Sequence, residues 1–349
     1  MPKSRRLIGI LCLTAAAMVA AGCSSSSSSS SASSAAGSPP ASSSASSSAG
    51  GIGQVSGKAN VAFAGSLLGL MNKTVGPAFS KATGAGYSGQ GTGAFAVSKE
   101  ISSGEITPNV FLSIGPLPIT QLGPKYYHWY VSLVSAPIVI AYSPKSKYAS
   151  QFEAIAAGKE PMSDLFAIMA KPGFVLGRTD PNTDPQGQAF YEMIQAAQSY
   201  YKLPAGTAEK ITGGLDNSKQ EYEETGLEGF LESGQLDAAS AYRSTAIQDG
   251  LHYINLPDVL NFGETSLAST YAKYTIKLDN GTIVHGVPTA VYGTQIGTTD
   301  AAAADAFIAY LLQPSVRAEF VKGGYTLVKP QVYGTGAPSI VTNAVSSSS

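Results

Sequence analysis

The chain has 349 residues with 22 basic and 23 acidic side chains, a formal net charge of −1. Without Lys3, Arg5 and Arg6 at the N-terminus, 19 basic side chains face 23 acidic ones, a net charge of −4. This balance argues against a nucleic-acid partner, whose binding surface would be basic. The two cysteines, Cys12 and Cys23, leave the sequence beyond them without a disulfide or a cysteine metal site.

The N-terminus has the features of an export signal. Basic residues precede a short apolar run at 7–20, which leads into AAGC at 20–23. This sequence resembles the lipobox of bacterial lipoproteins, which implies a signal peptide at 1–22 and lipid attachment to Cys23. An ordinary secretory peptide with an incidental cysteine is the alternative. Residues 23–56, beginning at the lipidated cysteine, are predicted to form a Ser-rich tether, because so few apolar side chains cannot offset the entropy of ordering.

From residue 57 onward, short apolar runs alternate with helical patterns. Strands are predicted at 61–64, 86–93 and 110–114, and helices at 67–81 and 94–103. Strands that alternate with helices are typical of an α/β fold with a mostly parallel sheet.

The run at 130–142 is long and apolar, which predicts a strand crossing between two lobes. The alternation continues with helices predicted at 188–201 and 222–231 and a strand at 237–242. The segment 287–292 is interpreted as the return crossing, and helices predicted at 300–312 and 315–321 follow it. Residues 340–349 are predicted to be a disordered tail.

The predicted architecture is therefore α/β with two lobes, each a mostly parallel sheet flanked by helices. Lobe 1 comprises residues 57–138 and 290–339, and lobe 2 comprises residues 139–289. A chain that passes from one lobe to the other and back leaves a cleft between them, where a ligand is expected to bind.

The most distinctive stretch is DPNTDPQG at 180–187, between the apolar run 173–176 and the helix predicted from 188. Two prolines stiffen this turn, and Asp and Asn side chains can accept hydrogen bonds from local amides. In an open α/β sheet, ligands lie at strand-to-helix turns of this kind. The simpler interpretation is that Asp184 only caps the following helix.

Two further turns, AGS at 64–66 and GTG at 91–93, each end a predicted strand and open a helix. Free amide groups and the positive end of the helix dipole would meet there, which makes a generic anion site. Plain N-capping by Ser66 and Thr92 is the alternative. Two such turns at consecutive strand ends favour a ligand.

Several motifs between residues 61 and 327 occur together in one family. They are FAGSL at 63–67, IVIAY at 138–142, DPNTDPQG at 180–187, LESG at 231–234, YRS at 242–244, LPD at 256–258, and Pro288 with VYG at 291–293. Through them the chain resembles the molybdate/tungstate-binding lipoproteins of ABC importers. The resemblance implies a periplasmic-binding-protein-like fold of type II, a monomeric, lipid-anchored receptor outside the cytoplasmic membrane, delivery of the oxyanion to a permease, and no cofactor.

In that family, hydroxyls and backbone amides hold the oxyanion, and two carboxylates approach its metal, expanding tetrahedral coordination towards octahedral. The resemblance assigns these carboxylates to Asp184 and Glu224, and the oxo-group donors to Ser66 and Tyr242. Glu221 and Glu223 lie beside Glu224 and are interpreted as a solvated helix face.

The second anion loop would be formed by Thr92, Gly93 and Ala94. Ala94 stands where the family usually has a Ser, so Thr92 and backbone amides would have to substitute. Gln186 replaces a common Cys, a change expected to matter little.

Carboxylates beside sulfate or phosphate would repel the anion, so a site with both acids facing the cleft disfavours those ligands. A receptor of the same fold for sulfate, phosphate or an organic anion is the alternative function. An enzyme is not expected, because the sequence has no G-x-S-x-G, P-loop or H-E-x-x-H motif, and His128, His252 and His285 are scattered.

Overall fold

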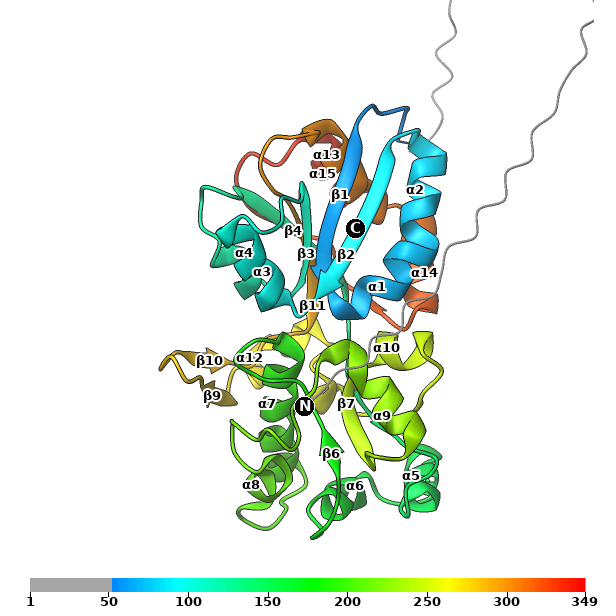
Figure 1. Cartoon of the computed structure of the whole chain (residues 1–349), viewed down its shortest axis with the longest axis vertical. Helices are drawn as coiled ribbons and strands as arrows, with labels where there is room; N and C mark the ends of the chain where they lie inside the picture. Colours follow the sequence, from blue (N-terminus) through cyan, green and yellow to red (C-terminus); the bar gives the residue numbers. More distant parts are fainter. Residues whose placement is uncertain (1–51, 349) are drawn as a thin grey trace, which may run out of the picture. The chain divides into compact units, whose positions relative to one another are not determined.

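The computed structural model describes residues 52–348, and within this range the strands form two main sheets (Figure 1). The larger sheet contains β1 (Lys58–Ala64), β2 (Gly86–Thr92), β3 (Val110–Ile114), β4 (Trp129–Ser135), β11 (Ala290–Gln295), β12 (Thr326–Leu327) and β13 (Val332–Gly334). Its order is β12-β4-β11-β3-β1-β2, and β13 also pairs with β4. β1 runs parallel to β2 and β3, whereas the pairs made by β11, β12 and β13 are antiparallel.

The smaller sheet has the order β6-β7-β5-β8. Its strands are β5 (Ile138–Tyr142), β6 (Leu176–Gly177), β7 (Ala238–Tyr242) and β8 (His252–Asn255), and a separate antiparallel hairpin consists of β9 (Thr275–Lys277) and β10 (Ile283–His285). β6 and β7 are parallel, while β5 is antiparallel to β7 and β8. The α/β prediction is therefore confirmed, but the prediction of mostly parallel sheets is wrong. Both sheets are mixed, because strands at the crossings run against their neighbours.

Two short connections carry the chain between the sheets. The first, at Ala136 and Pro137, splits the run that the sequence predicts as a single strand, because proline has no N–H with which to continue a ladder. The second precedes β11, and its Thr289 binds the first connection. The Ala136 N–H donates to the Thr289 carbonyl at 2.9 Å, and Thr289 Oγ1 donates to the Ala136 carbonyl at 2.7 Å.

Because the sheets part at these connections, we call residues 52–135 and 290–348 the larger lobe and residues 138–285 the smaller lobe. The boundaries predicted at 138/139 and 289/290 lie beside the connections.

In the larger lobe, a continuous helical run follows β1. It consists of η1 (Gly65–Leu67), α1 (Leu68–Leu70), η2 (Met71–Val75) and α2 (Gly76–Thr83). The sequence predicts one regular helix here, but at η2 the turn widens and the Gly76 N–H reaches back to the Met71 carbonyl. Pro77 has no N–H, so the regular pattern cannot pass through it. The remaining helices of this lobe are α3 (Ala94–Ser103), α4 (Leu117–Thr120), α13 (Ala301–Leu311), α14 (Pro314–Lys322) and α15 (Ser339–Ser347).

The smaller lobe surrounds its sheet with short helices and one long one, α7, which begins at the DPNTDPQG turn (Figure 1). Its helical segments are α5 (Ala149–Ala156), α6 (Met162–Met169), α7 (Pro185–Tyr200), α8 (Thr207–Thr212), η3 (Glu224–Gly226), α9 (Leu227–Ser233), α10 (Arg243–Gln248), α11 (Asp258–Asn261), η4 (Thr265–Leu267) and α12 (Ala268–Tyr271).

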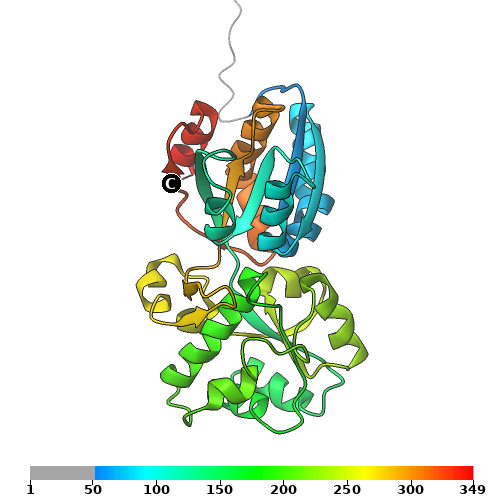
Figure 2. The ribbon, with the colours of Figure 1, turned by 60° about the vertical axis from the view of Figure 1, so that its left-hand side comes forward.

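The C-terminal segment differs from the prediction of a disordered tail at 340–349. Residues up to Ser347 form α15, which packs beside α13 (Figure 2). Val341 is fully buried, and Ser348 Oγ donates to the Leu312 carbonyl at 2.7 Å. Val341, Ala344 and Val345 recur at helical spacing, so one apolar face of the segment turns towards the core.

The predicted signal peptide (1–22), Cys23 and the tether up to residue 51 lie outside the described residues. The last part of the predicted tether, 52–56, belongs to the larger lobe, where the Val55 N–H donates to the Thr83 carbonyl at 2.8 Å. Within residues 52–348, no helix combines the length and apolar character that crossing a bilayer requires.

Candidate functional site

The DPNTDPQG turn connects β6 to α7 and holds Asp184 in place. Asp184 Oδ1 accepts a hydrogen bond from the Gln186 N–H at 2.8 Å, so Asp184 is the N-cap of α7. Asp180 Oδ1 accepts from the Asn182 N–H at 2.8 Å, which fixes the turn before it. Gly187 has to be a glycine, because a Cβ there would lie 2.5 Å from the Thr179 carbonyl oxygen.

Capping occupies only one oxygen of Asp184. The side chain is buried, with 7% of its residue surface exposed, and it lies against Gly93 of the larger lobe. A Cβ on Gly93 would lie 3.3 Å from Asp184 Oδ2. Gly93 itself is the N-cap of α3 and supplies no side chain to its first amides. One carboxyl oxygen of Asp184 therefore lies beside the free N-terminal end of α3.

Glu224 occupies the equivalent place at the first anion turn. A Cβ on Gly65 would lie only 2.6 Å from Glu224 Oε2, so this carboxyl group fits because residue 65 is a glycine. The backbone amide of Ser66 hydrogen-bonds to the Glu224 carboxyl group. Ser66 Oγ is buried and has no hydrogen-bond partner among the described residues.

Tyr242 lies at the end of β7 and is almost fully buried. Within the described part of the chain its hydroxyl has no hydrogen-bond partner. Burial raises the pKa of Tyr242 well above its ordinary value, and the neighbouring Asp184 and Glu224 raise it further. The predicted residues Ser66, Gly93, Asp184, Glu224 and Tyr242 are thus brought together from separate segments of both lobes.

The other members of the predicted second anion loop lie next to Gly93. Thr92 is half-buried at the end of β2, and Ala94 is buried as the first residue of α3. No hydrogen bond of the Thr92 side chain is seen within residues 52–348, and Ala94 can offer only its backbone amide.

Of the three neighbouring acids, the structure singles out Glu224. Glu223 is exposed, and Glu221 forms an ion pair with the buried Arg178 at 3.1 Å. Glu221 also accepts a hydrogen bond from the Asn217 N–H at 2.7 Å. The interpretation of Glu221 as part of a solvated helix face is therefore wrong, because its charge is needed to balance Arg178.

Comparison with known proteins decides the family. Residues 59–326 match the bacterial extracellular solute-binding proteins. The chain belongs to this family. It is 29% identical over 246 residues to a molybdate/tungstate-binding protein of Thermococcus kodakarensis, covering 64% of this chain and 68% of that protein. It is 33% identical over 192 residues to a molybdate/tungstate-binding protein of Pyrococcus abyssi, covering 50% and 54% respectively.

This solute-binding protein spans about half to two thirds of the length of the curated relatives it matches. Among solved structures, it is similar to the periplasmic molybdate-binding protein of Azotobacter vinelandii, with a TM-score of 0.54 and 15% sequence identity. That comparison covers 79% of this chain and 100% of the other. At such low identity the likeness shows the fold, which confirms the predicted periplasmic-binding-protein-like architecture.

Sequence reasoning gave too little weight to Gln186. Its backbone N–H is the donor to Asp184, while its side-chain Nε2 donates to Glu224 Oε1 at 3.5 Å. Its Oε1 accepts from Ser240 Oγ at 2.8 Å, which fixes the amide so that its NH₂ group faces Glu224. One residue thus contacts both acids, so the prediction that replacing Cys by Gln matters little does not fit these contacts.

Tyr325 was missed altogether, since nothing nearby in the sequence marks it. Its ring is buried and its hydroxyl donates to the Ser66 carbonyl at 3.0 Å, from a position 259 residues away. This contact joins distant segments of the chain, and through it Tyr325 supports the first anion turn.

Burial dominates the electrostatics of the two acids. It raises the pKa of Asp184 to about 7, and it raises the pKa of Glu224 well above its ordinary value, with a further contribution from Asp184. Hydrogen bonds from the Gln186 and Ser66 amides oppose these shifts. Within residues 52–348, no group of three or more His, Cys, Asp or Glu side chains could hold a metal ion.

We expect the stability of the ligand-free solute-binding protein to fall as pH rises from about 4 to about 7. The folded protein keeps a proton on Asp184 that the unfolded chain releases, so this stabilisation is complete below pH 4 and is lost through the folded-state pKa. The loss should not exceed roughly 4 kcal/mol. Asp184→Asn, which can still cap α7, should reduce the change of stability with pH.

Urea unfolding at several pH values measures this effect, with Asp164→Asn, an exposed site, as the control. If the free energy of unfolding changed with pH as steeply in Asp184→Asn as in the unmodified protein, this expectation would be contradicted.

Proposed function

We propose that this protein captures molybdate or tungstate between its two lobes and delivers the oxyanion to an ABC transporter permease. The observation that carries the proposal is the pair of buried carboxyl groups of Asp184 and Glu224, each set against a glycine at the start of a helix in the opposite lobe. At these positions an ordinary anion site would offer only hydrogen-bond donors, but here each turn also has an acid side chain beside it.

The coordination chemistry of the central atom decides between oxyanions, because sulfate, molybdate and tungstate all carry two negative charges. Two unit charges of like sign at 4 Å repel by about 4 kcal/mol at an effective dielectric constant near 20. Sulfate offers a carboxylate neither a proton nor a further coordination position, so the ionised forms of Asp184 and Glu224 would oppose it. Hydrogen phosphate could donate its single O–H to only one of the two carboxylates. Molybdate and tungstate contain a hexavalent metal that accepts further hard oxygen ligands. The carboxylates then become ligands of a positive centre.

The oxo groups need donors, and the site offers several. Ser66 Oγ and Tyr242 OH are buried without partners in the described part of the chain. The α3 amides at Gly93 and Ala94 and the side chain of Thr92 would serve the second loop. A ligand that accepted hydrogen bonds from these donors would offset the free-energy cost of leaving polar groups buried and unpaired.

Contacts between the lobes support capture by closure. Gln248 Nε2 in the smaller lobe donates to the Ser66 carbonyl in the larger lobe at 3.4 Å. Arg243 donates from Nε to the Gly324 carbonyl at 2.7 Å and from Nη2 to Thr326 Oγ1 at 2.8 Å. Hinge motion at the two connections would open these contacts to admit the ligand.

The names of the relatives from Thermococcus kodakarensis and Pyrococcus abyssi agree with this ligand. We further propose that the protein is a monomer outside the cytoplasmic membrane, that Cys23 carries the lipid anchor, and that it binds solute without turning it over. The alternative is that the same fold binds sulfate, phosphate or an organic anion.

Calorimetric titration of the purified protein with tungstate, molybdate and sulfate tests the ligand. We expect tight binding of the two metal oxyanions and no heat from sulfate. Asp184→Asn and Glu224→Gln keep the shape of each side chain and should each weaken tungstate binding more than about 100-fold, beyond the usual effect of an outer-shell partner. Glu232→Gln, at an exposed acid of α9, is the matched control and should change little. Comparable sulfate binding would favour the alternative.

Gln186 should act as a positioning residue for both carboxylates. We expect Gln186→Ala to weaken tungstate binding by about tenfold, because Glu224 loses its amide donor. Gln195→Ala removes the same side chain from the same helix, where Nε2 contacts the Thr275 carbonyl instead, and should have no effect on affinity. Equal affinities of the two variants would show that Gln186 does not position the site.

A further inference from the structure

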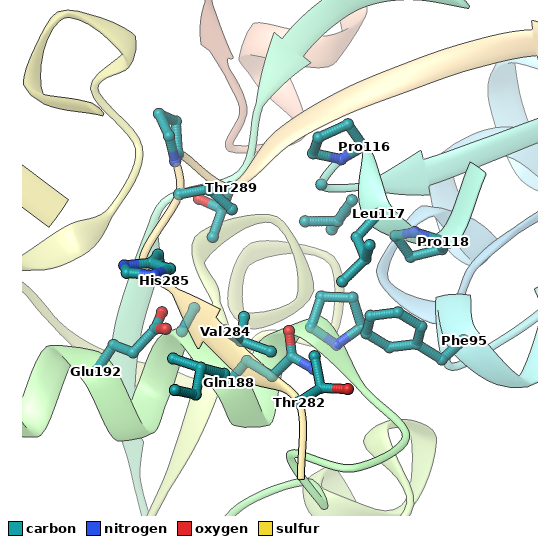
Figure 3. A pocket seen from close by; sticks show the side chains of 17 residues that line it. Phe95, Pro116, Leu117, Pro118, Gln188, Glu192, Thr282, Val284, His285 and Thr289 are labelled. Atoms are coloured by element: carbon teal, nitrogen blue, oxygen red, sulfur yellow. The ribbon is translucent and has the colours of Figure 1, made fainter. Parts of the chain in front are cut away.

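A cavity of about 320 Å³ lies between the lobes, and Pro185, the chain neighbour of Asp184, is among the residues that line it (Figure 3). One wall is formed by Phe95 and by residues 114–118, which run from the end of β3 into α4. The facing wall is one side of α7, and residues 282–289, which include β10 and the return connection, close the third side. The volume is at the lower end of the range for small-molecule pockets.

The walls are mainly apolar, and so is the rim. Leu117, Ile283 and Val287 line the pocket with 40%, 60% and 45% of their surface exposed. Large aliphatic side chains grouped around the mouth of a cavity indicate that something apolar covers them. No Lys or Arg is among the lining residues, so no permanently cationic side chain would pair with an organic anion there.

One acid stands out in this surrounding. Glu192 lies on α7, one helical turn after Gln188, and its side chain lines the pocket (Figure 3). Only 2% of its surface is exposed, and Oε1 has no hydrogen-bond partner within residues 52–348. Burial raises the pKa of Glu192 to about 9. His285 also lines the pocket, and its Nδ1 contacts the Ala272 carbonyl at 3.2 Å.

We propose that this pocket binds a small organic amine, whose apolar body contacts the proline- and aliphatic-rich walls and whose ammonium group contacts the carboxyl group of Glu192. A buried acid without a partner is costly, and an ammonium group supplies both the hydrogen bond and the opposite charge that it lacks. The amine site is distinct from the oxyanion site, since neither Asp184 nor Glu224 lines the pocket.

Binding of an ammonium group requires Glu192 to ionise, and its proton then passes to the buffer. Titration of the purified protein with benzylamine near neutral pH, in two buffers of different ionisation enthalpy, measures this proton. We expect close to one proton released per benzylamine bound. Benzyl alcohol, which has the same ring and no charge, should bind without proton release.

The matched variants are Glu192→Gln and the exposed Glu209→Gln. Glu192→Gln should bind benzylamine at least about tenfold more weakly, as expected for loss of a hydrogen bond to a charged group, and should bind benzyl alcohol as before. Glu209→Gln should bind both ligands like the unmodified protein. Absence of benzylamine binding to the unmodified protein, binding without proton release, or equal binding by Glu192→Gln would overturn the proposal. Tungstate binding is measured in a separate titration, so a negative result with benzylamine would leave the proposed oxyanion site untouched.

Discussion

The structure depends on the burial of two acid side chains where the lobes meet. Asp184 and Glu224 belong to the smaller lobe, yet each places a carboxyl oxygen against a glycine of the larger lobe. Removal of a carboxylate from water costs several kcal/mol unless a charge or hydrogen bonds compensate it. In the closed arrangement burial therefore favours the neutral acids, and a ligand with a positive centre would favour the ionised ones. Under the proposed function, the same constraint would make closure dependent on the ligand.

The surrounding chain accommodates these acids by close backbone approach. Gly65 and Gly93 leave room for the carboxyl oxygens, and no larger residue could replace Gly65 without moving Glu224. Gln186 contacts both acids, and its orientation is set by Ser240. The α7 helix thus begins at its N-cap Asp184 and carries the amide donor Gln186 and, further along, Glu192. This one helix links the candidate oxyanion site to the neighbouring apolar pocket.

Local patterns predicted much of this arrangement. The DPNTDPQG turn, the helix after it and the glycine turns at 64–66 and 91–93 all depend on residues close in sequence, and they form as predicted. Non-local pairing was not predictable in the same way. The antiparallel partners of β11, the ion pair between Arg178 and Glu221, and the contact of Tyr325 with Ser66 each join distant segments. α15 was missed because its apolar face consists of small residues in a serine-rich end.

X-ray absorption spectroscopy of the tungstate-loaded protein at a tungsten edge tests the central claim most directly. Coordination by Asp184 and Glu224 predicts six oxygen neighbours, four of them short oxo bonds and two longer carboxylate bonds. A tungsten centre with four equivalent oxygens, as in free tungstate, would contradict ligation by the carboxylates. The two acids would then need another explanation for their burial.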